Sequence, residues 1–402
     1  MKDNQILNAL FQAQNVSHAA ILLSNEYEDS HGKFASVVAL GEKRIFSDPI
    51  ELDHFQGIAL GHISYQFKNT IEFISKTLHL EETTPLCMFF EPQKGLFISR
   101  DGSSETFGGF EFTSEQLDLN ETFDIGLWQE TTPKEDYLNA VEKIRNDIRY
   151  GVYYELNYCI SFSAFANLNP YLLFYYFNQL APSPFAAFYK LKDQYLLCAS
   201  PERFLMKSGQ SLMTQPIKGT RKRIPGKERE IIAELKDHPK DLAENKMIVD
   251  LVRNDLSRIC KPSTVLVPEL CEIHTFSHVH QMISTVVGEI EQDVKFHHII
   301  DAVFPMGSMT GAPKIEVMKH IDLLEDFHRE FYSGCVGYMK DGDFDFNVVI
   351  RSLEYRKNRL KYCVGGAITY DSIAEEEYEE CLTKASGIMN LIEKVSNSNQ
   401  DD

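Results

Sequence analysis

Two segments of the sequence each carry a pair of acidic residues three positions apart. Asp241 and Glu244 lie in DLAENKMIVD, and Glu377 and Glu380 lie in EYEECLTKA. Residues three apart are neighbours on one face of a helix, so each pair would present its carboxylates together. Four converging carboxylates would suit Mg²⁺, which prefers oxygen ligands. Acidic pairs in the first turns of a helix also occur without a metal, because they complement the helix dipole. Spacing alone leaves both interpretations open.

A lysine and a glutamate stand at two predicted strand ends. Lys218 lies in TQPIKGTRKR, and Glu202 lies in SPERFL. A partly buried lysine can lose its proton and act as a nucleophile. A carboxyl group with a raised pKa can act as a general acid. Basic clusters are more often solvated surfaces, so residue type alone assigns neither role.

The segment FPMGSMTGAPK predicts a glycine-containing loop that enters a helix near Pro313. Backbone N–H groups at such a helix start can hold a carboxylate or a phosphate. The segment is not a Walker loop, because GxxxxGK[ST] is not satisfied. By itself it is typical of an ordinary turn.

The elements that must position these residues follow from local patterns. Thr132, Pro133 and Glu135 predict a helix start with a capping box, Thr132 being the N-cap. Further helices are expected over residues 226–258, with a break at His238-Pro239, and over residues 373–393. Runs at residues 331–342, 345–356 and 359–370 indicate three strands of an antiparallel meander. Strands and helices in mixed order, without regular βαβ alternation, favour an α+β fold.

Composition limits the kinds of partner. The net charge is −19, which argues against nucleic acid or an anionic membrane, because both are bound through clustered Lys and Arg. No apolar run is long enough to span a bilayer, and the polar N-terminal residues predict no signal peptide, so we expect a cytoplasmic protein. The eight cysteines show no CxxC spacing, which predicts buried core thiols rather than a zinc site or disulfides.

Together these blocks resemble one family, the chorismate-utilising enzymes, which includes anthranilate synthase, aminodeoxychorismate synthase, isochorismate synthase and salicylate synthase. The collinear blocks are SPERFL, PIKGTRKR, DLAENKMIVDLVRNDLSRI, FPMGSMTGAPK, FYSGCVGY, VVIRSLE, VGGAITYDS and EYEECLTKA. The resemblance implies two large antiparallel β-sheets packed as a sandwich with flanking helices. The helix start at Thr132 separates a strand-rich part (1–130) from the chorismate-binding catalytic part that the resemblance covers (131–394), and the polar C-terminal residues predict a disordered tail (395–402).

The resemblance also implies roles for individual residues. Mg²⁺ would be held by Glu244 and Glu380, with Asp241 and Glu377 acting through metal-bound water. Glu202 matches the family's general acid. The positions that match substrate-binding residues are Thr310, Tyr332, Arg351, Gly365, Gly366, Lys384 and Gln281.

Lys218 and Glu155 bear on which reaction is catalysed. PIKGT is similar to aminodeoxychorismate synthases, in which the lysine is thought to attack C2 of chorismate while the C4 hydroxyl leaves. Ammonia then adds at C4 and expels the lysine. Anthranilate synthases usually have alanine at Lys218. Isochorismate and salicylate synthases use a water-activating lysine at the position of Glu155. The resemblance therefore implies amination at C4 to 4-amino-4-deoxychorismate, toward para-aminobenzoate and folate.

The sequence also bears on the nitrogen source, and it departs from the family pattern at two positions. The sequence contains no Gly-x-Cys-x-Gly elbow, so ammonia is expected from a glutamine amidotransferase subunit. Gln281 replaces the usual histidine, and Ala367 replaces a usual glycine. The alternatives are an anthranilate synthase component I, and a non-catalytic homologue that binds chorismate or an amidotransferase.

Overall fold

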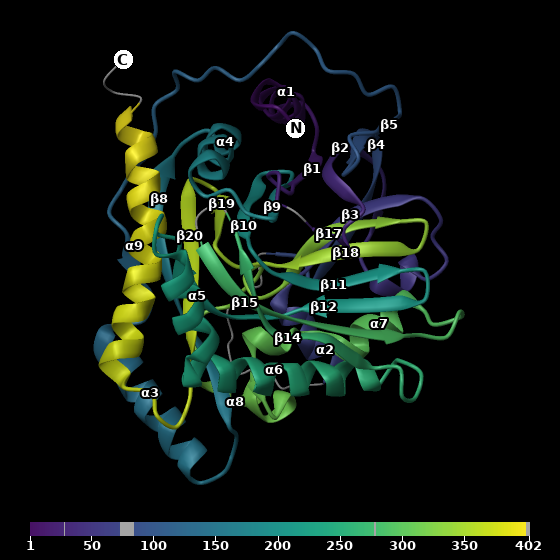
Figure 1. Ribbon diagram of the computed structural model, residues 1–402. Helices are drawn as coiled ribbons and strands as arrows, with labels where there is room; N and C mark the ends of the chain where they lie inside the picture. Colours follow the sequence, from purple (N-terminus) through teal and green to yellow (C-terminus); the bar gives the residue numbers. More distant parts are fainter. Residues whose placement is uncertain (28, 73–83, 277–278, 399–402) are drawn as a thin grey trace.

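The computed structural model describes residues 1–27, 29–72, 84–276 and 279–398 of the chain (Figure 1). Its α-helices are α1 (Asp3–Gln14), α2 (Lys68–Ile71), α3 (Lys134–Arg149), α4 (Pro170–Leu180), α5 (Glu228–Asp237), α6 (Pro239–Ser257), α7 (Phe296–Val303), α8 (Lys314–Leu324) and α9 (Ala374–Ser398). Short 3₁₀ helices are η1 (Pro49–Leu52), η2 (Tyr65–Phe67) and η3 (Gly307–Met309).

The strands form antiparallel ladders that fall into two groups sharing β4. One group runs, in spatial order, through β5 (Ser104–Phe107), β4 (Cys87–Ser99), β2 (Phe34–Phe46), β1 (His18–Leu23), β9 (Phe185–Leu191), β10 (Gln194–Ser200), β19 (Ser352–Arg356), β20 (Arg359–Ile368) and β8 (Glu155–Asn167). The other runs from β4 through β3 (Ile58–Ile63), β17 (Cys335–Lys340), β18 (Asp343–Val348), β11 (Arg203–Ser208), β12 (Ser211–Gln215) and β15 (Val279–Glu289) to β13 (Ile217–Lys222) and β14 (Leu266–Thr275). Short strands β6 (Asp124–Ile125), β7 (Gln129–Glu130) and β16 (Gly311–Ala312) pair with β8.

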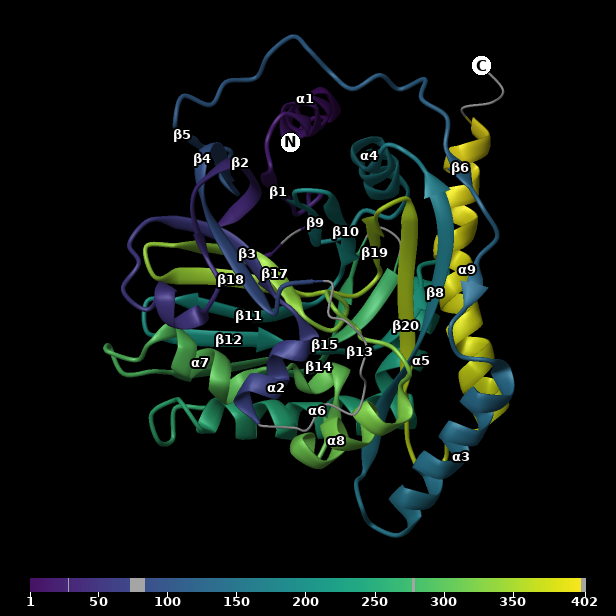
Figure 2. The same cartoon turned by 180° about the vertical axis from the view of Figure 1, so that it is seen from behind.

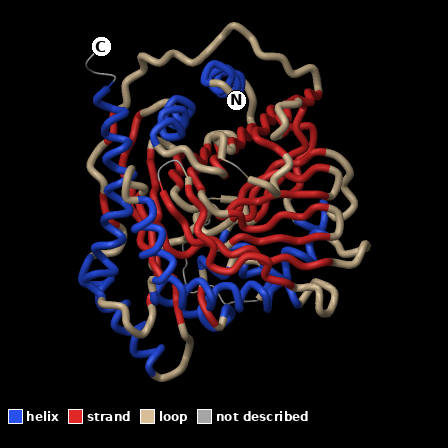
Figure 3. The backbone as a smooth tube through the Cα atoms, viewed as in Figure 1, coloured by secondary structure: helices blue, strands red, loops and turns tan. Residues whose placement is uncertain are grey.

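A buried apolar layer joins the two groups of strands. Ala187 and Tyr189 of β9 belong to the same hydrophobic cluster as Val336 and Tyr338 of β17. Burial of such side chains between two sheets is the main force that holds a sandwich together. In Figure 3 the strands, drawn in red, gather in the middle of the molecule with helices around them.

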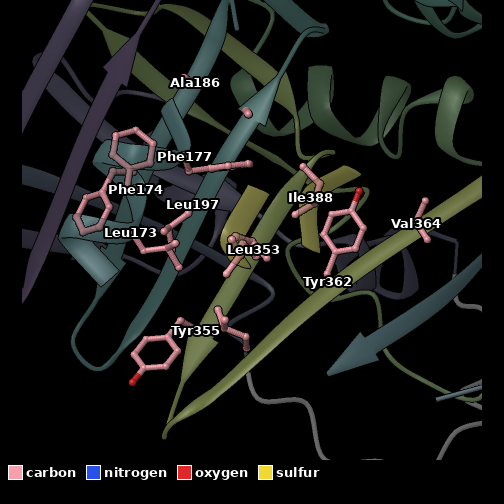
Figure 4. Close-up of a cluster of buried hydrophobic side chains, with 14 of the residues drawn as sticks. Leu173, Phe174, Phe177, Ala186, Leu197, Leu353, Tyr355, Tyr362, Val364 and Ile388 are labelled. Atoms are coloured by element: carbon pink, nitrogen blue, oxygen red, sulfur yellow. The ribbon is translucent and has the colours of Figure 1, made fainter. Parts of the chain in front are cut away.

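Helices cover the outer face of each group. A second cluster packs α3, α4 and α9 on β8, β10, β19 and β20, and Figure 4 shows part of it, with Phe174 and Phe177 of α4 near Leu197 and Leu353 of the strands. A third cluster packs α6 and α7 on β11, β12 and β18. Figure 2 shows the arrangement from behind, with α9 beside β8 and β20. The predicted α+β fold of antiparallel sheets with flanking helices is confirmed.

The helix predicted over residues 226–258 is confirmed, including its interruption. α5 ends at Asp237 and α6 begins at Pro239. Proline suits the first turn of a helix, where its missing N–H leaves no bond unmade, and it cannot continue a preceding one. The eight cysteines are buried and free, as predicted.

Two local predictions were wrong. α3 begins one residue later than expected, with Pro133 at the N-cap, and the Thr132 hydroxyl instead donates to Asp326 Oδ1 at 3.0 Å. The run 345–356 is not one strand, because it breaks after Val348 and its halves pair with different neighbours, β18 with β11 and β19 with β10. Arg351, in the break, has φ of 48°, outside the conformation of a strand.

The N-terminal residues share ladders with the rest of the chain, since β1 pairs with β9 and β3 pairs with β17. The boundary at residues 130–131 stays a prediction. The predicted tail over 395–402 starts within α9, which extends to Ser398, and residues 399–402 lie outside the described part. Within the described ranges, no helix has the length and apolar character needed to cross a membrane.

Candidate active site

Lys218 is brought against α6 by an irregular stretch of β13. The pairing of β13 with β15 shifts register between Ile217 and Thr220. Gly219 lies in this stretch with φ of 81°, and a Cβ atom there would lie 3.0 Å from Asp241 Cγ. Only glycine adopts this conformation at little cost and leaves room for so close an approach. The register shift and the glycine thus place Lys218 beside the acidic face of α6.

The Lys218 amine lies between two carboxylates. Its Nζ donates to Glu155 Oε1 at 3.3 Å and lies 4.0 Å from Glu244 Oε2, with 12% of the side chain exposed. Burial lowers the pKa of Lys218, but the Glu155 and Glu244 carboxylates outweigh it and hold the pKa above its usual value. The resting lysine is therefore an ammonium.

The acidic residues of α6 and α9 converge, and a second lysine lies between them. Lys240 Nζ is 4.0 Å from Glu244 Oε1 and 3.5 Å from Glu377 Oε1. Glu377 also accepts a hydrogen bond from Ser372 Oγ at 2.7 Å. Figure 1 shows α6 and the lower half of α9 approaching one another. The structure thus brings Glu244 and Glu377 to one place from different helices.

The other two predicted metal ligands have cationic partners. Glu380 Oε1 lies 2.7 Å from Lys384 Nζ. Burial acts to raise the Glu380 pKa, yet Lys384 and the nearby Lys240 and Lys218 hold it below its usual value. Asp241 Oδ2 lies 3.0 Å from an Arg221 nitrogen and 3.0 Å from His238 Nδ1. Glu380 therefore lies among Lys384, Lys240 and Lys218. Asp241 instead contacts Arg221 and His238.

The donor set can be tested against a hard cation such as Mg²⁺. Among the described residues, no three His, Cys, Asp or Glu side chains already form a metal cluster. However, the Lys240 ammonium lies between Glu244 and Glu377, which marks a place where positive charge is stabilised. Glu244 Oε1 is buried without a hydrogen-bond partner, and burial raises the Glu244 pKa to about 7. Carboxylate oxygens are the ligands that Mg²⁺ prefers, so the residues fit such an ion once Lys240 moves aside.

Glu202 is a buried carboxyl group that accepts a hydrogen bond from a serine side chain. Ser308 Oγ, in η3, donates to Glu202 Oε1 at 2.8 Å, and 5% of Glu202 and 7% of Ser308 are exposed. Burial raises the Glu202 pKa to about 7, while the Ser308 hydrogen bond and the Lys218 and Arg351 charges act in the opposite direction. A carboxyl group with this pKa is poised to give up a proton near neutral pH.

The predicted substrate-binding residues differ in accessibility. Arg351 is exposed, and no described carboxylate forms an ion pair with it, so its guanidinium is available to an anion. Thr310 is fully buried, with its hydroxyl donating to Met306 O at 3.2 Å, and Tyr332 is 5% exposed. The structure leaves the Arg351 side chain accessible and encloses the other two.

Lys384 and the two glycines of β20 lie together at α9. Lys384 Nζ donates to Gly365 O at 3.0 Å. A Cβ atom on Gly366 would lie 3.3 Å from Glu377 Oε2, so the missing side chain allows this carboxylate close to the strand. Gln281 lies on β15, opposite Thr220, and its Nε2 donates to Thr220 Oγ1 at 3.4 Å. Gln281 therefore lies opposite Thr220, which follows Lys218 by two residues on β13.

Sequence reasoning did not identify three residues of this site. Glu155 appeared only as a departure from a water-activating lysine, and Lys240 and Ser308 carried no assigned role. Ser308 lies inside FPMGSMTGAPK, two residues before Thr310, which was the available signal. The position of Lys240 depends on the approach of two helices far apart in the sequence, and no local pattern encodes it.

The fold of the chain is similar to the folds of solved structures. It superposes on anthranilate synthase component I of Streptococcus pneumoniae with a TM-score of 0.78 and 24% identity, over 90% of this chain and 93% of that one. The menaquinone-specific isochorismate synthase of Escherichia coli gives a TM-score of 0.79 with 16% identity, over 96% and 91%. These likenesses concern the fold alone.

The sequence comparisons define the family. The model of the chorismate binding enzymes matches residues 9–390, and the chain belongs to this family. It is 34% identical over 285 residues to aminodeoxychorismate synthase component 1 of Escherichia coli, covering 70% of this chain and 63% of that protein. For the Bacillus subtilis protein of the same name, identity is 32%, with 85% and 78% covered. Anthranilate synthase component 1 of Saccharolobus solfataricus is 31% identical, with 84% and 81% covered.

Proposed function

We propose that this protein aminates chorismate at C4 with ammonia to give 4-amino-4-deoxychorismate. The observation that carries the proposal is the Lys218 amine, which lies 3.3 Å from Glu155 and 4.0 Å from Glu244 at the convergence of α6 and α9. A lysine in that position can attack C2 and be expelled later. Similarity to aminodeoxychorismate synthases of two bacteria supports this reaction.

The chain's own residues supply the steps of the proposed reaction. The Lys218 ammonium first loses a proton to solvent, and the neutral amine then forms a bond to C2 while the two conjugated ring double bonds shift and the C4 hydroxyl leaves. Glu202 gives its proton to that hydroxyl, which departs as water. Ammonia then bonds to C4, both double bonds shift back, and Lys218 is released as a neutral amine that takes a proton from solvent, while the new C4 ammonium returns a proton to Glu202. Two displacements with allylic shifts thus put nitrogen at C4, whereas direct attack of ammonia at C2 would give the ortho product.

Substrate and metal would be held by the charged residues around the lysine. Arg351 and Lys384 are the cationic groups proposed to hold the carboxylates of chorismate. Mg²⁺ would be held by Glu244 and Glu380, with Glu377 and Asp241 in support, and when bound it would supply Lewis-acid stabilisation of the ring carboxylate and the leaving hydroxyl.

The nitrogen source is proposed to be a separate glutamine amidotransferase. The relatives in Escherichia coli and Bacillus subtilis are named component 1, which supports a second component. The sequence contains no Gly-x-Cys-x-Gly elbow of a glutaminase.

Anthranilate formation is the second candidate function. Similarity to the Saccharolobus solfataricus anthranilate synthase over 84% of this chain favours it. Lys218 disfavours it, because a lysine that reacts at C2 blocks the carbon at which the ortho product forms.

Product analysis tests the proposal directly. The purified chain is incubated with chorismate, Mg²⁺ and ammonium chloride, and an aminodeoxychorismate lyase is added before chromatography. We expect para-aminobenzoate. Anthranilate as the main product would establish the second candidate, and no turnover of chorismate would favour a binding protein without catalysis.

A further inference from the structure

Glu155 has a fixed backbone position beside Lys218. It is the first residue of β8, and it pairs with Ala312 of β16 while Leu156 pairs with Gly311. Gly311 has φ of 144°, and a Cβ atom there would lie 2.1 Å from Glu155 O. The adjacent Tyr154 N–H donates to Ala312 O at 2.7 Å. The start of β8 is therefore held by β16, and the Glu155 side chain leaves it at a defined point.

The Glu155 carboxylate is placed at a cost to stability. Glu155 is 1% exposed, Oε1 accepts from Lys218, and Oε2 is buried with no hydrogen-bond partner in the described part of the chain. A buried acceptor without a partner destabilises the folded state. Packing alone does not account for a carboxylate at this buried position, so its contact with Lys218 calls for a functional reason.

Glu155 is the carboxylate that remains available to Lys218 when substrate is bound. Of the two acids beside the amine, Glu244 is the proposed metal ligand and lies farther away, at 4.0 Å against 3.3 Å. Lysine has a flexible four-carbon side chain, which does not by itself fix its nitrogen. A nucleophile misplaced by about 1 Å can lose about 100-fold in rate. The contact with Glu155 limits this freedom.

We propose that Glu155 is a positioning residue that holds the Lys218 nitrogen at C2 of the bound ring and thereby sets which carbon ammonia attacks. This rests on the proposed function. With Lys218 in place, C2 is taken and ammonia adds at C4. Without Glu155, the Lys218 amine is no longer held at C2. Ammonia can then attack C2, and the ortho product forms.

The test measures the ratio of ortho to para product with ammonium chloride as the nitrogen source. Glu155→Ala removes the contact, Glu155→Asp draws the carboxylate back by one methylene, and Glu155→Gln keeps an oxygen that can accept from the amine. We expect the ortho fraction to rise about tenfold or more in Glu155→Ala, to rise in Glu155→Asp, and to rise least in Glu155→Gln. Glu316→Ala, a partly exposed residue of α8 whose carboxylate pairs with Lys319, is the matched control and should leave the ratio unchanged.

The outcomes separate the two proposals. A wild-type chain that makes only ortho product, or none, would overturn the proposed function and the positioning role with it. A wild type that makes para product, with Glu155 variants that lose total activity at an unchanged ratio, would overturn the positioning role alone. If Glu155→Ala does not fold, as judged by circular dichroism, Glu155→Asp decides the question through the same ratio.

Discussion

The hydrogen bond from Ser308 to Glu202 makes a definite prediction about pH dependence. Glu202 must carry a proton to release the C4 hydroxyl as water, and burial raises its pKa to about 7. Activity should therefore fall as the pH rises through about 7, because the acid becomes ionised. Lys218, Arg351 and Ser308 all stabilise the ionised carboxylate, so removing any of them should raise the pKa further.

Ser308→Ala removes one of these three contributions without changing charge. A hydrogen bond to a charged group contributes about 1.5–3 kcal/mol, and 1.36 kcal/mol corresponds to one pH unit. The midpoint of the basic limb of kcat/KM should therefore move upward by about 1–2 pH units. The maximal rate should fall as well, because the carboxyl group is no longer held by the 2.8 Å contact.

The assay is the initial rate of chorismate consumption from pH 6 to pH 9, with ammonia concentration held constant by adjusting total ammonium. Ser257→Ala is the control, since this exposed residue at the end of α6 donates its hydroxyl to Asn254 O at 2.7 Å. A basic limb that stays at the wild-type pH, or moves downward, would refute the assignment of Glu202 as the acid tuned by Ser308.

Three further predictions concern the charged groups of the site. Lys218→Ala should remove most para product while leaving chorismate binding intact, as measured by product chromatography and calorimetry. Lys240→Gln should strengthen Mg²⁺ binding about two- to fivefold in a calorimetric titration, because the Lys240 ammonium no longer competes with the metal. The exposed ion pairs of such an ammonium contribute up to about 1 kcal/mol. Weaker binding would contradict the placement of the site. Glu202→Gln should remove a pH dependence of folding. The folded state keeps the Glu202 proton up to about pH 7, whereas the ordinary pKa is 4.5, so the free energy of unfolding of the wild type should fall by about 3 kcal/mol as the pH rises across that interval. Urea denaturation should show this fall in the wild type and not in the variant.

Local sequence patterns predicted the elements that depend on local chemistry. The break at His238-Pro239 follows from what proline does to a helix, and the separation of α5 from α6 confirms it. Thr132 shows the limit of such patterns. A threonine is a good N-cap in isolation, but its hydroxyl finds Asp326 instead, a residue nearly two hundred positions away that no local rule includes.

The arrangement of the site depended on tertiary contacts that the sequence did not display. Helical spacing predicted that Glu377 and Glu380 share a face of a helix. It did not predict that the Lys240 side chain of α6 lies between Glu244 and Glu377, which is visible only in the folded chain. The break at Arg351 interrupts a run of strand-forming residues, because a positive φ there redirects the chain from β18 to β19. Glu155 is ordinary in the sequence, and its importance comes from burial and from a 3.3 Å contact with Lys218, which lies on a strand of the other group.

The central claim is that Lys218 bonds to C2 of chorismate, and trapping that bond tests it most directly. The wild-type chain is mixed with chorismate and Mg²⁺ without ammonium, quenched with acid and analysed by peptide mass spectrometry. The account predicts a chorismate-derived adduct, formed with loss of water, on the peptide that contains Lys218, and its disappearance when ammonium is added before the quench. Rapid formation of para product with ammonium, together with an unmodified Lys218 under every quench condition, would contradict the account.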